Sequence, residues 1–372
     1  MATSSNPSRL PELVRDTQLQ ARVQGATTIH VRRTGRRAAS REERWTRVDN
    51  RILGQGGGGT VWVERKENTS SEANEKRAVK AIRIGQNKSL SETVRYVREL
   101  EALAKFSQEK YAEFFVKSYG WYELTGWLCI AMEYCEHGDL RRYLDDVGKM
   151  PEAHVRDVTS QIVAGLAMMH DEGFAHRDLK PANILIKAKP PDEWWVKLCD
   201  LGLSKRAGDA VGASTIRGTP GFWAPEILGL GGSDPKMADP TKVDIWCLGE
   251  TVVQMLTGCT AFDSIAGLVQ YYQGEPFPIP RLRENGLESL LAIDFVTMSM
   301  ARDPPERLGS IQATPKQPSQ TNHTKPRQPK SPLSPHSLVD HEDKSQPRAA
   351  TARLSALQKN KKREKKKRRC FD

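Results

Sequence analysis

The chain has 372 residues and a formal net charge of +11, and this length allows two or three domains. The positive charge is concentrated at the two ends: residues 311–372 hold 16 Lys and Arg against 5 Asp and Glu, and residues 1–46 hold 9 against 4. The central body is therefore slightly acidic. No apolar run is long enough to span a membrane, and the six cysteines lack zinc-like spacing. We expect a soluble protein of the nucleus and/or cytoplasm.

Residues 1–46 are rich in Arg, Ser and Thr and show no sustained hydrophobic periodicity. Such a composition buries too little apolar surface to offset the entropy of the chain. It predicts a disordered basic arm. We favour an arm that is simply solvated over one that binds nucleic acid or a phosphopeptide.

A glycine cluster follows between two alternating apolar segments, over residues 52–63. Gly54, Gly56, Gly59 and Val61 have the spacing G-x-G-x-x-G-x-V. Glycine lets a backbone approach phosphate groups and offer its N–H groups to them. The next segment has the pattern of a strand, which argues against a dinucleotide-binding turn or a P-loop. The tip of an ordinary hairpin remains an alternative.

Further elements are predicted from periodicity. Residues 77–82 alternate as a strand that carries Lys80, and residues 93–106 have helical spacing and carry Glu99. Residues 127–132 form a buried-strand pattern, and residues 151–170 form a long amphipathic helix. A charged surface position is the alternative for Glu99.

The most informative stretch is residues 176–185, which reads HRDLKPANIL. Asp178, Lys180 and Asn183 put a carboxylate, a cation and an amide in one short loop. Phosphoryl transfer needs such a set: a carboxylate for the hydroxyl proton, a cation for the phosphoryl charge and an amide for metal. Asp200 follows the apolar strand 195–199. A solvated polar turn is the alternative for each segment alone.

These segments, in this order and spacing, resemble the eukaryotic protein kinases, and Lys180-Pro181 resembles the serine/threonine type. The resemblance implies an α+β, two-lobed protein-kinase fold. It implies a small antiparallel-sheet lobe with one helix over about 47–132, a hinge over about 133–139 and a larger, mainly helical lobe over about 140–309. The ends, 1–46 and 310–372, are expected to be disordered basic tails.

The resemblance also implies roles for individual residues. Asp178 and Lys180 would be catalytic, Glu99 would steady the phosphate-binding Lys80, and ATP and Mg²⁺ would be the cofactors. Asn183 and Asp200 would hold the metal. The nucleotide would be bound by Gly54, Gln55, Gly56, Gly57, Gly58, Gly59, Val61, Ala78, Lys80, Met132, Glu133, Cys135 and Asp139.

Control by phosphorylation is also expected from the resemblance. Ser214 and Thr215 lie in the segment between Asp200 and Ala224-Pro225-Glu226. An upstream kinase would phosphorylate Thr215, or Ser214 beside it, and the phosphate would engage Arg177. Arg307 is expected to pair with Glu226 in the interior.

The C-terminal tail ends in a nearly continuous run of cations, Lys359 to Arg369. Such a block suits an acidic partner, and an import receptor is preferred over nucleic acid or anionic lipid. Two departures from the family leave alternatives open: Gly58 replaces an aromatic residue, and the last helix of the large lobe is missing. The alternatives to an active serine/threonine protein kinase acting on protein substrates are a pseudokinase scaffold and a nucleic-acid-binding protein.

Overall fold

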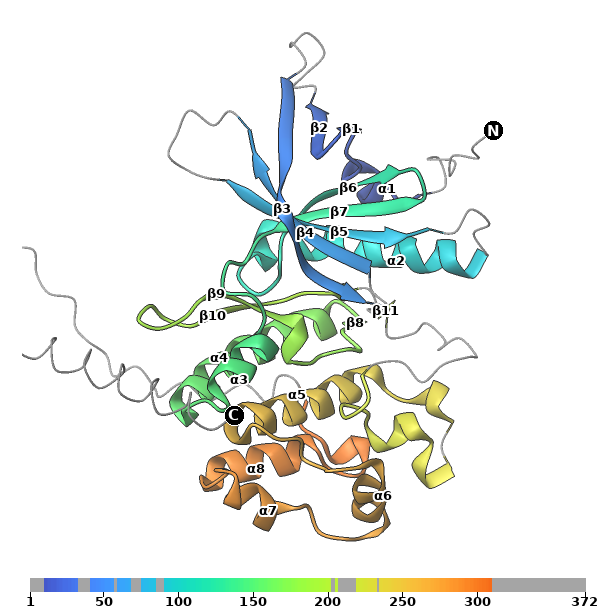
Figure 1. The fold of residues 1–372 in the computed structure, drawn as a ribbon. Helices are drawn as coiled ribbons and strands as arrows, with labels where there is room; N and C mark the ends of the chain where they lie inside the picture. Colours follow the sequence, from blue (N-terminus) through green and yellow to red (C-terminus); the bar gives the residue numbers. More distant parts are fainter. Residues whose placement is uncertain are drawn as a thin grey trace, which may run out of the picture. The chain divides into compact units, whose positions relative to one another are not determined.

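The computed structural model describes residues 10–32, 41–56, 59–67, 75–84, 90–201, 205–206, 219–232 and 234–309 (Figure 1). The N-terminal part is an antiparallel sheet with strand order β1-β2-β3-β4-β5-β7-β6. Its strands are β1 (Ala21–Gln24), β2 (Thr27–Arg32), β3 (Arg41–Gly56), β4 (Gly59–Lys66), β5 (Lys76–Arg83), β6 (Ser118–Leu124) and β7 (Trp127–Glu133). Helix α2 (Leu90–Phe106) supplies Glu99 to Lys80, so it covers the face of β5 from which Lys80 projects.

The prediction of a disordered arm over residues 1–46 is wrong for residues 10–32 and 41–46. These residues form α1 (Glu12–Asp16), β1, β2 and the first part of β3, and they bury Val14 and Ile29 completely. Gly25, with a φ of 60°, allows a two-residue turn in which Gln24 pairs with Thr27. The composition averaged over residues 1–46 gives no sign of this hairpin.

The N-terminal segment also reaches the opposite edge of the sheet. Gln18 forms a parallel bridge with Trp121 of β6, where the Leu19 N–H donates to the Trp121 carbonyl at 2.7 Å. The Trp121 indole N–H donates to the Val14 carbonyl at 2.9 Å. The described residues before 47 thus contact both edges of the part of the sheet formed by β3 to β7, through β2 on β3 and through Gln18 on β6. They cover the sheet face opposite α2, where Val79, Ala81, Tyr122 and Cys129 form a small core.

The C-terminal part is mainly helical, as predicted. Its helices are α3 (Leu140–Val147), α4 (Glu152–Asp171), α5 (Pro240–Thr257), α6 (Ile265–Gln273), α7 (Ile279–Glu284) and α8 (Leu290–Ser299). Two short strand pairs complete it: β9 (Ile184–Ala188) with β10 (Trp195–Leu198), and β8 (Phe174–Ala175) with β11 (Lys205–Arg206). Helix α5 is buried along most of its length, so it forms the centre of the core.

The predicted interior pair between Arg307 and Glu226 is confirmed. Both terminal nitrogens of Arg307 donate to the Glu226 carboxylate, at 2.6 and 2.8 Å. The pair ties the end of the described chain to the segment before α5. None of the helices in the described ranges is both long and apolar enough to cross a membrane.

Candidate active site

The backbone of the loop after β8 is fixed by one buried carboxylate. Asp244 of α5 is completely buried, and it accepts hydrogen bonds from the N–H groups of His176 and Arg177, each at 2.7 Å. His170 of α4 places its Nε2 2.9 Å from the same carboxylate. Arg177 has a φ of 67°, which a non-glycine residue adopts at a cost. The hydrogen bonds to Asp244 stabilise this conformation and so position the next residue, Asp178.

The structure brings the predicted catalytic residues of this loop together. The Oδ2 atom of Asp178 accepts from the Lys180 ammonium at 2.8 Å and from the Asn183 amide at 3.0 Å. Asn183 also donates to the Asp178 backbone carbonyl at 2.7 Å, which closes the loop on itself. The side chain of Asp178 is 13% exposed, so it is held firmly but can be reached from solvent.

Thr219 is a member of this cluster that sequence reasoning missed. Its hydroxyl donates to the Oδ1 atom of Asp178 at 3.0 Å and accepts from the Lys180 ammonium at 2.6 Å. Thr219 therefore orients the side chains of both Asp178 and Lys180. The sequence signal that could have pointed to it is Gly218-Thr219-Pro220, which lies between Asp200 and Ala224-Pro225-Glu226.

A second cluster forms around Lys80 on β5. Its ammonium lies 3.3 Å from the Glu99 carboxylate and 2.6 Å from Oδ1 of Asp200. Burial alone would lower the pKa of Lys80, but the charges of Glu99 and Asp200 outweigh it and raise that pKa. The two carboxylates therefore favour the charged form of Lys80. The predicted partnership of Glu99 with Lys80 is confirmed.

The two clusters are joined through the strand that leads to Asp200. The Cys199 N–H donates to the Asn183 carbonyl at 3.0 Å, and Nε2 of His176 lies 3.1 Å from the Cys199 carbonyl. Asp200 has a φ of 58°, again an uncommon backbone conformation for a non-glycine residue. The next side chain, Leu201, is buried and anchors this turn.

The glycine-rich turn lies between β3 and β4, as the sequence predicted. Gly59 has a φ of 113°, and a Cβ atom there would lie 2.3 Å from the Ala81 carbonyl oxygen. Only glycine fits at this position. Gly54 and Gln55 are exposed at the end of β3, while Gly57 and Gly58 lie outside the described residues. Val61 pairs directly with Lys80, which places the turn beside the Lys80 cluster.

The predicted hinge begins at Glu133, the last residue of β7. Ala78 pairs with Met132 across β5 and β7, and Cys135 is buried. The Glu133 carboxylate lies 2.7 Å from the Lys187 ammonium and 2.8 Å from that of Lys197. Burial opposes ionisation, but hydrogen bonds from the two lysines lower the pKa of Glu133. Through these ion pairs, the Glu133 carboxylate links the hinge to β9 and β10.

Asp139 has a local structural role in addition to the contact predicted for it. Its carboxylate accepts the Arg142 N–H at 2.9 Å and so caps the N-terminus of α3. The predicted contact with the ribose of a nucleotide stays a prediction.

The donor set next to the catalytic loop fits a magnesium ion. The Asp200 carboxylate is 38% exposed, and the Asn183 amide nitrogen is engaged by Asp178, which leaves the amide oxygen for a cation. Mg²⁺ bound with nucleotide usually takes one or two protein oxygens, with the remainder from phosphate and water. Asn183 and Asp200 are the residues that would hold it.

Three predictions concern residues outside the described ranges. Ser214 and Thr215 lie in the undescribed range 207–218, and the cationic run from Lys359 to Arg369 lies beyond residue 309. The prediction that the last helix is missing concerns the same C-terminal range. All three stay predictions.

Comparison with known proteins decides the family. The model of the protein kinase domain matches residues 47–318. The chain belongs to the protein kinase family. This assignment confirms the resemblance seen in the sequence, and the match begins after the N-terminal segment that covers the sheet.

Similar proteins are serine/threonine kinases or proteins of cell division. Cell division control protein 7 of Schizosaccharomyces pombe is 33% identical over 52% of this chain and 17% of its own length. Cytokinesis protein sepH of Emericella nidulans is 31% identical over 69% and 18%. Mitogen-activated protein kinase kinase kinase 2 of Arabidopsis thaliana is 31% identical over 58% and 31%. The chain thus spans less than a third of the length of these relatives.

Solved structures show the same fold. The Rad53 kinase domain with SCD2 matches with a TM-score of 0.54 at 26% identity, covering 73% of this chain and 86% of that one. Rad53 1-466 in complex with AMP-PNP matches with a TM-score of 0.56 at 28% identity, covering 73% and 64%. The two-lobed fold class predicted from the sequence is confirmed.

Proposed function

We propose that this protein kinase is an active, ATP-dependent serine/threonine kinase that transfers the γ-phosphoryl group of ATP to hydroxyl groups of protein substrates. The observation that carries the proposal is the Asp178 carboxylate, held by Lys180, Asn183 and Thr219. A carboxylate so oriented can accept the proton of an attacking hydroxyl, while the neighbouring ammonium stabilises the charge of the transferred group.

Lys80 would position the phosphates of the nucleotide for this reaction. Because it is cationic and anchored by Glu99, its ammonium can fix the phosphates of a nucleotide beneath the glycine-rich turn. Bound Mg²⁺, held by Asp200 and Asn183, would supply neutralisation of phosphate charge. A Rad53 structure in the comparison was solved with AMP-PNP, which supports a nucleotide as the ligand.

The pseudokinase alternative is less well supported. The sequence contains the side chains that phosphoryl transfer needs, and the contacts around Asp178 and around Lys80 support an active enzyme over a scaffold. No observation favours the nucleic-acid-binding alternative. Localisation to the nucleus and/or cytoplasm stays a prediction.

The proposal is tested with the full-length protein, Mg²⁺ and ATP labelled on the γ-phosphate. The acceptor is a protein substrate that offers serine, threonine and tyrosine. Label should appear on serine and threonine. Asp178→Asn should lower transfer by roughly a thousandfold, whereas Asp146→Asn, which removes an exposed carboxylate from α3, should leave it unchanged. Label on tyrosine alone, or equal transfer by Asp178→Asn, would overturn the proposal.

A further inference from the structure

Helix α1 lies before residue 47, where the family match begins, and it packs against α2, the helix that carries Glu99. Of the described elements, α1 contacts α2 most extensively, ahead of β6 and β11. Val14 of α1 is completely buried, and it belongs to the same hydrophobic core as Leu100 and Leu103 of α2. A helix outside the family match therefore forms part of the packing that holds α2 in place.

The edge strand of the kinase sheet is shaped to receive this segment. The Trp121 indole of β6 donates to the Val14 carbonyl at 2.9 Å, and the Trp121 backbone N–H donates to the Thr17 carbonyl at 3.1 Å. Gly120, beside Trp121, has a φ of 126°, and a Cβ atom there would lie 2.5 Å from the Thr17 carbonyl oxygen. Residue 120 lies within the family match, so a glycine of the kinase domain makes room for the chain that precedes the domain.

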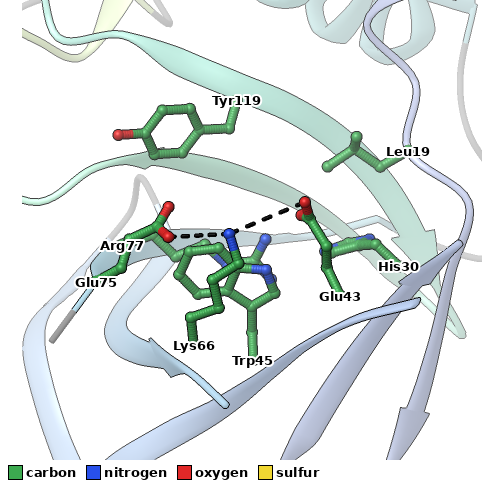
Figure 2. A pocket seen from close by; sticks show the side chains of 8 residues that line it. All are labelled: Leu19, His30, Glu43, Trp45, Lys66, Glu75, Arg77 and Tyr119. Atoms are coloured by element: carbon green, nitrogen blue, oxygen red, sulfur yellow. Dashed lines mark hydrogen bonds and ion pairs between the residues drawn. The ribbon is translucent and has the colours of Figure 1, made fainter. Parts of the chain in front are cut away.

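The residues just before position 47 are anchored on the opposite face of the sheet. The Trp45 ring contacts two cations of the kinase domain: its centre lies 4.3 Å from the Arg77 guanidinium and 5.3 Å from the Lys66 ammonium. Lys66 also lies 3.9 Å from Glu43 and 2.9 Å from Glu75 (Figure 2). The segment is thus attached at two separate places, so α1 has a fixed base from which to press on α2.

The position of α2 decides whether Glu99 reaches Lys80. The two charged groups lie 3.3 Å apart, which is near the upper limit of a hydrogen bond, whereas the Lys80 ammonium lies 2.6 Å from Asp200. A small shift of α2 away from β5 would therefore break the contact with Glu99 first. Phosphoryl transfer by a protein kinase requires this ion pair to be in place.

We propose that Val14 is a positioning residue for phosphoryl transfer, because its packing holds α2 where Glu99 meets Lys80. The inference rests on the proposed kinase function. Val14 lies in the hydrophobic core and acts only through α2. When α2 is released, Lys80 loses Glu99 and stays on Asp200, the carboxylate that would hold Mg²⁺. Both consequences lower the rate of transfer without altering Asp178.

The first test measures hydrogen–deuterium exchange on the full-length protein, for the amides of residues 97–104 in α2 and, as an internal reference, for those of α5. Val14→Asp puts a charge into the shared core, so exchange in α2 should become roughly fivefold faster while exchange in α5 stays unchanged. Val23→Asp is the matched control, because Val23 lies in the same segment but is 43% exposed on β1. Equal exchange in the two variants, or the same acceleration in α2 and α5, would overturn the proposal.

The second test measures phosphoryl transfer by the same proteins, with each rate divided by the folded fraction from circular dichroism. Val14→Asp should lower kcat by roughly tenfold, Val14→Ala should lower it less, and Val14→Ile, which keeps the apolar contact, should retain most of the wild-type kcat. Val23→Asp should leave kcat unchanged. Faster exchange in α2 with an unchanged kcat would contradict the positioning role. A wild type without any transfer would instead overturn the proposed kinase function, and the exchange test would still show whether α1 holds α2.

Discussion

Strand β5 carries two buried cations that project from opposite faces of the sheet, and they differ in how they are paired. Arg77 and its partner Glu64 are each only 2% exposed. Lys80 is 11% exposed, and it divides its charge between the buried Glu99 and Asp200, whose side chain is 38% exposed. One ion pair is sealed, and the other is open to solvent on one side.

The difference distinguishes a structural role for Arg77 from the catalytic role proposed for Lys80. The second oxygen of Glu64 accepts from Thr28 at 2.9 Å and from Trp62 at 3.1 Å, so the sealed network is saturated and has no place for a substrate. Lys80 can exchange its contact with Asp200 for a contact with a phosphate group, because the Asp200 carboxylate is accessible to solvent. Asp200 would then be available to hold Mg²⁺. A buried cation therefore indicates function only where one of its partners can be replaced.

The largest effect is expected from breaking the sealed pair. Arg77→Met leaves the Glu64 carboxylate buried without its cation, which typically costs about 3–5 kcal/mol of the free energy of unfolding. Urea denaturation would measure the loss. Arg65→Met, at an exposed position on β4, is the control and should change stability by less than about 0.5 kcal/mol. Equal stability of the two variants would show that the sealed pair contributes nothing.

A smaller effect is expected in the active site from Thr219. Thr219→Ala removes the hydroxyl that orients Asp178 and Lys180, so kcat should fall by roughly ten- to a hundredfold. The KM for ATP should change little. Thr219→Ser retains the hydroxyl and should recover most of the activity. A variant that keeps the wild-type kcat without the hydroxyl would refute this positioning role.

The covered face should also show a dependence on pH through His30. Burial, reinforced by the charge of Arg77, lowers the pKa of His30 to about 4, while Glu64 and Glu43 oppose the shift. The unfolded chain takes up this proton below pH 6.5, so the folded state loses stability as pH falls from about 6.5 to 4. After a reduction for screening by solvent, the contribution of His30 to the free energy of unfolding is about 1–2 kcal/mol.

The measurement compares urea denaturation at pH 7 and pH 5 for the wild type and His30→Gln. A comparison with a variant is needed because Glu250 affects the pH dependence of stability in the opposite direction. Burial raises the pKa of Glu250 to about 8, so its contribution to the free energy of unfolding falls as pH rises. The wild type should lose more stability than the variant on acidification. An identical loss in both proteins would exclude His30 as the cause.

The clustering of side chains around Asp178 could be predicted from the sequence because these residues are close together in the chain. Asp178, Lys180 and Asn183 lie within six residues, so their spacing alone indicates a common target. The partnerships of Lys80 with Glu99 and of Arg307 with Glu226 were available only through the resemblance to kinases, since neither is encoded by a local pattern.

The rest depends on contacts between distant parts of the chain. Thr219 reaches Asp178 across 41 residues of sequence. Residues 10–32 and 41–46 are ordered because Gln18 pairs with Trp121 on β6 and β2 pairs with β3. Neither partner can be identified from the composition of residues 1–46. Composition alone therefore predicts disorder for residues 10–32 and 41–46, although they contribute strands to the sheet.

The most direct test exchanges the cations of the two faces: Lys80→Arg against Arg77→Lys, each measured for the phosphoryl-transfer rate and the free energy of unfolding. Both changes keep the charge, so neither leaves a buried carboxylate unpaired. Lys80→Arg should lower the rate by about a hundredfold through misplaced phosphates and keep stability within about 1 kcal/mol. Arg77→Lys should keep the rate and lose about 1–2 kcal/mol of stability. Wild-type transfer by Lys80→Arg, or loss of transfer in Arg77→Lys alone, would contradict the assignment of catalysis to the open face.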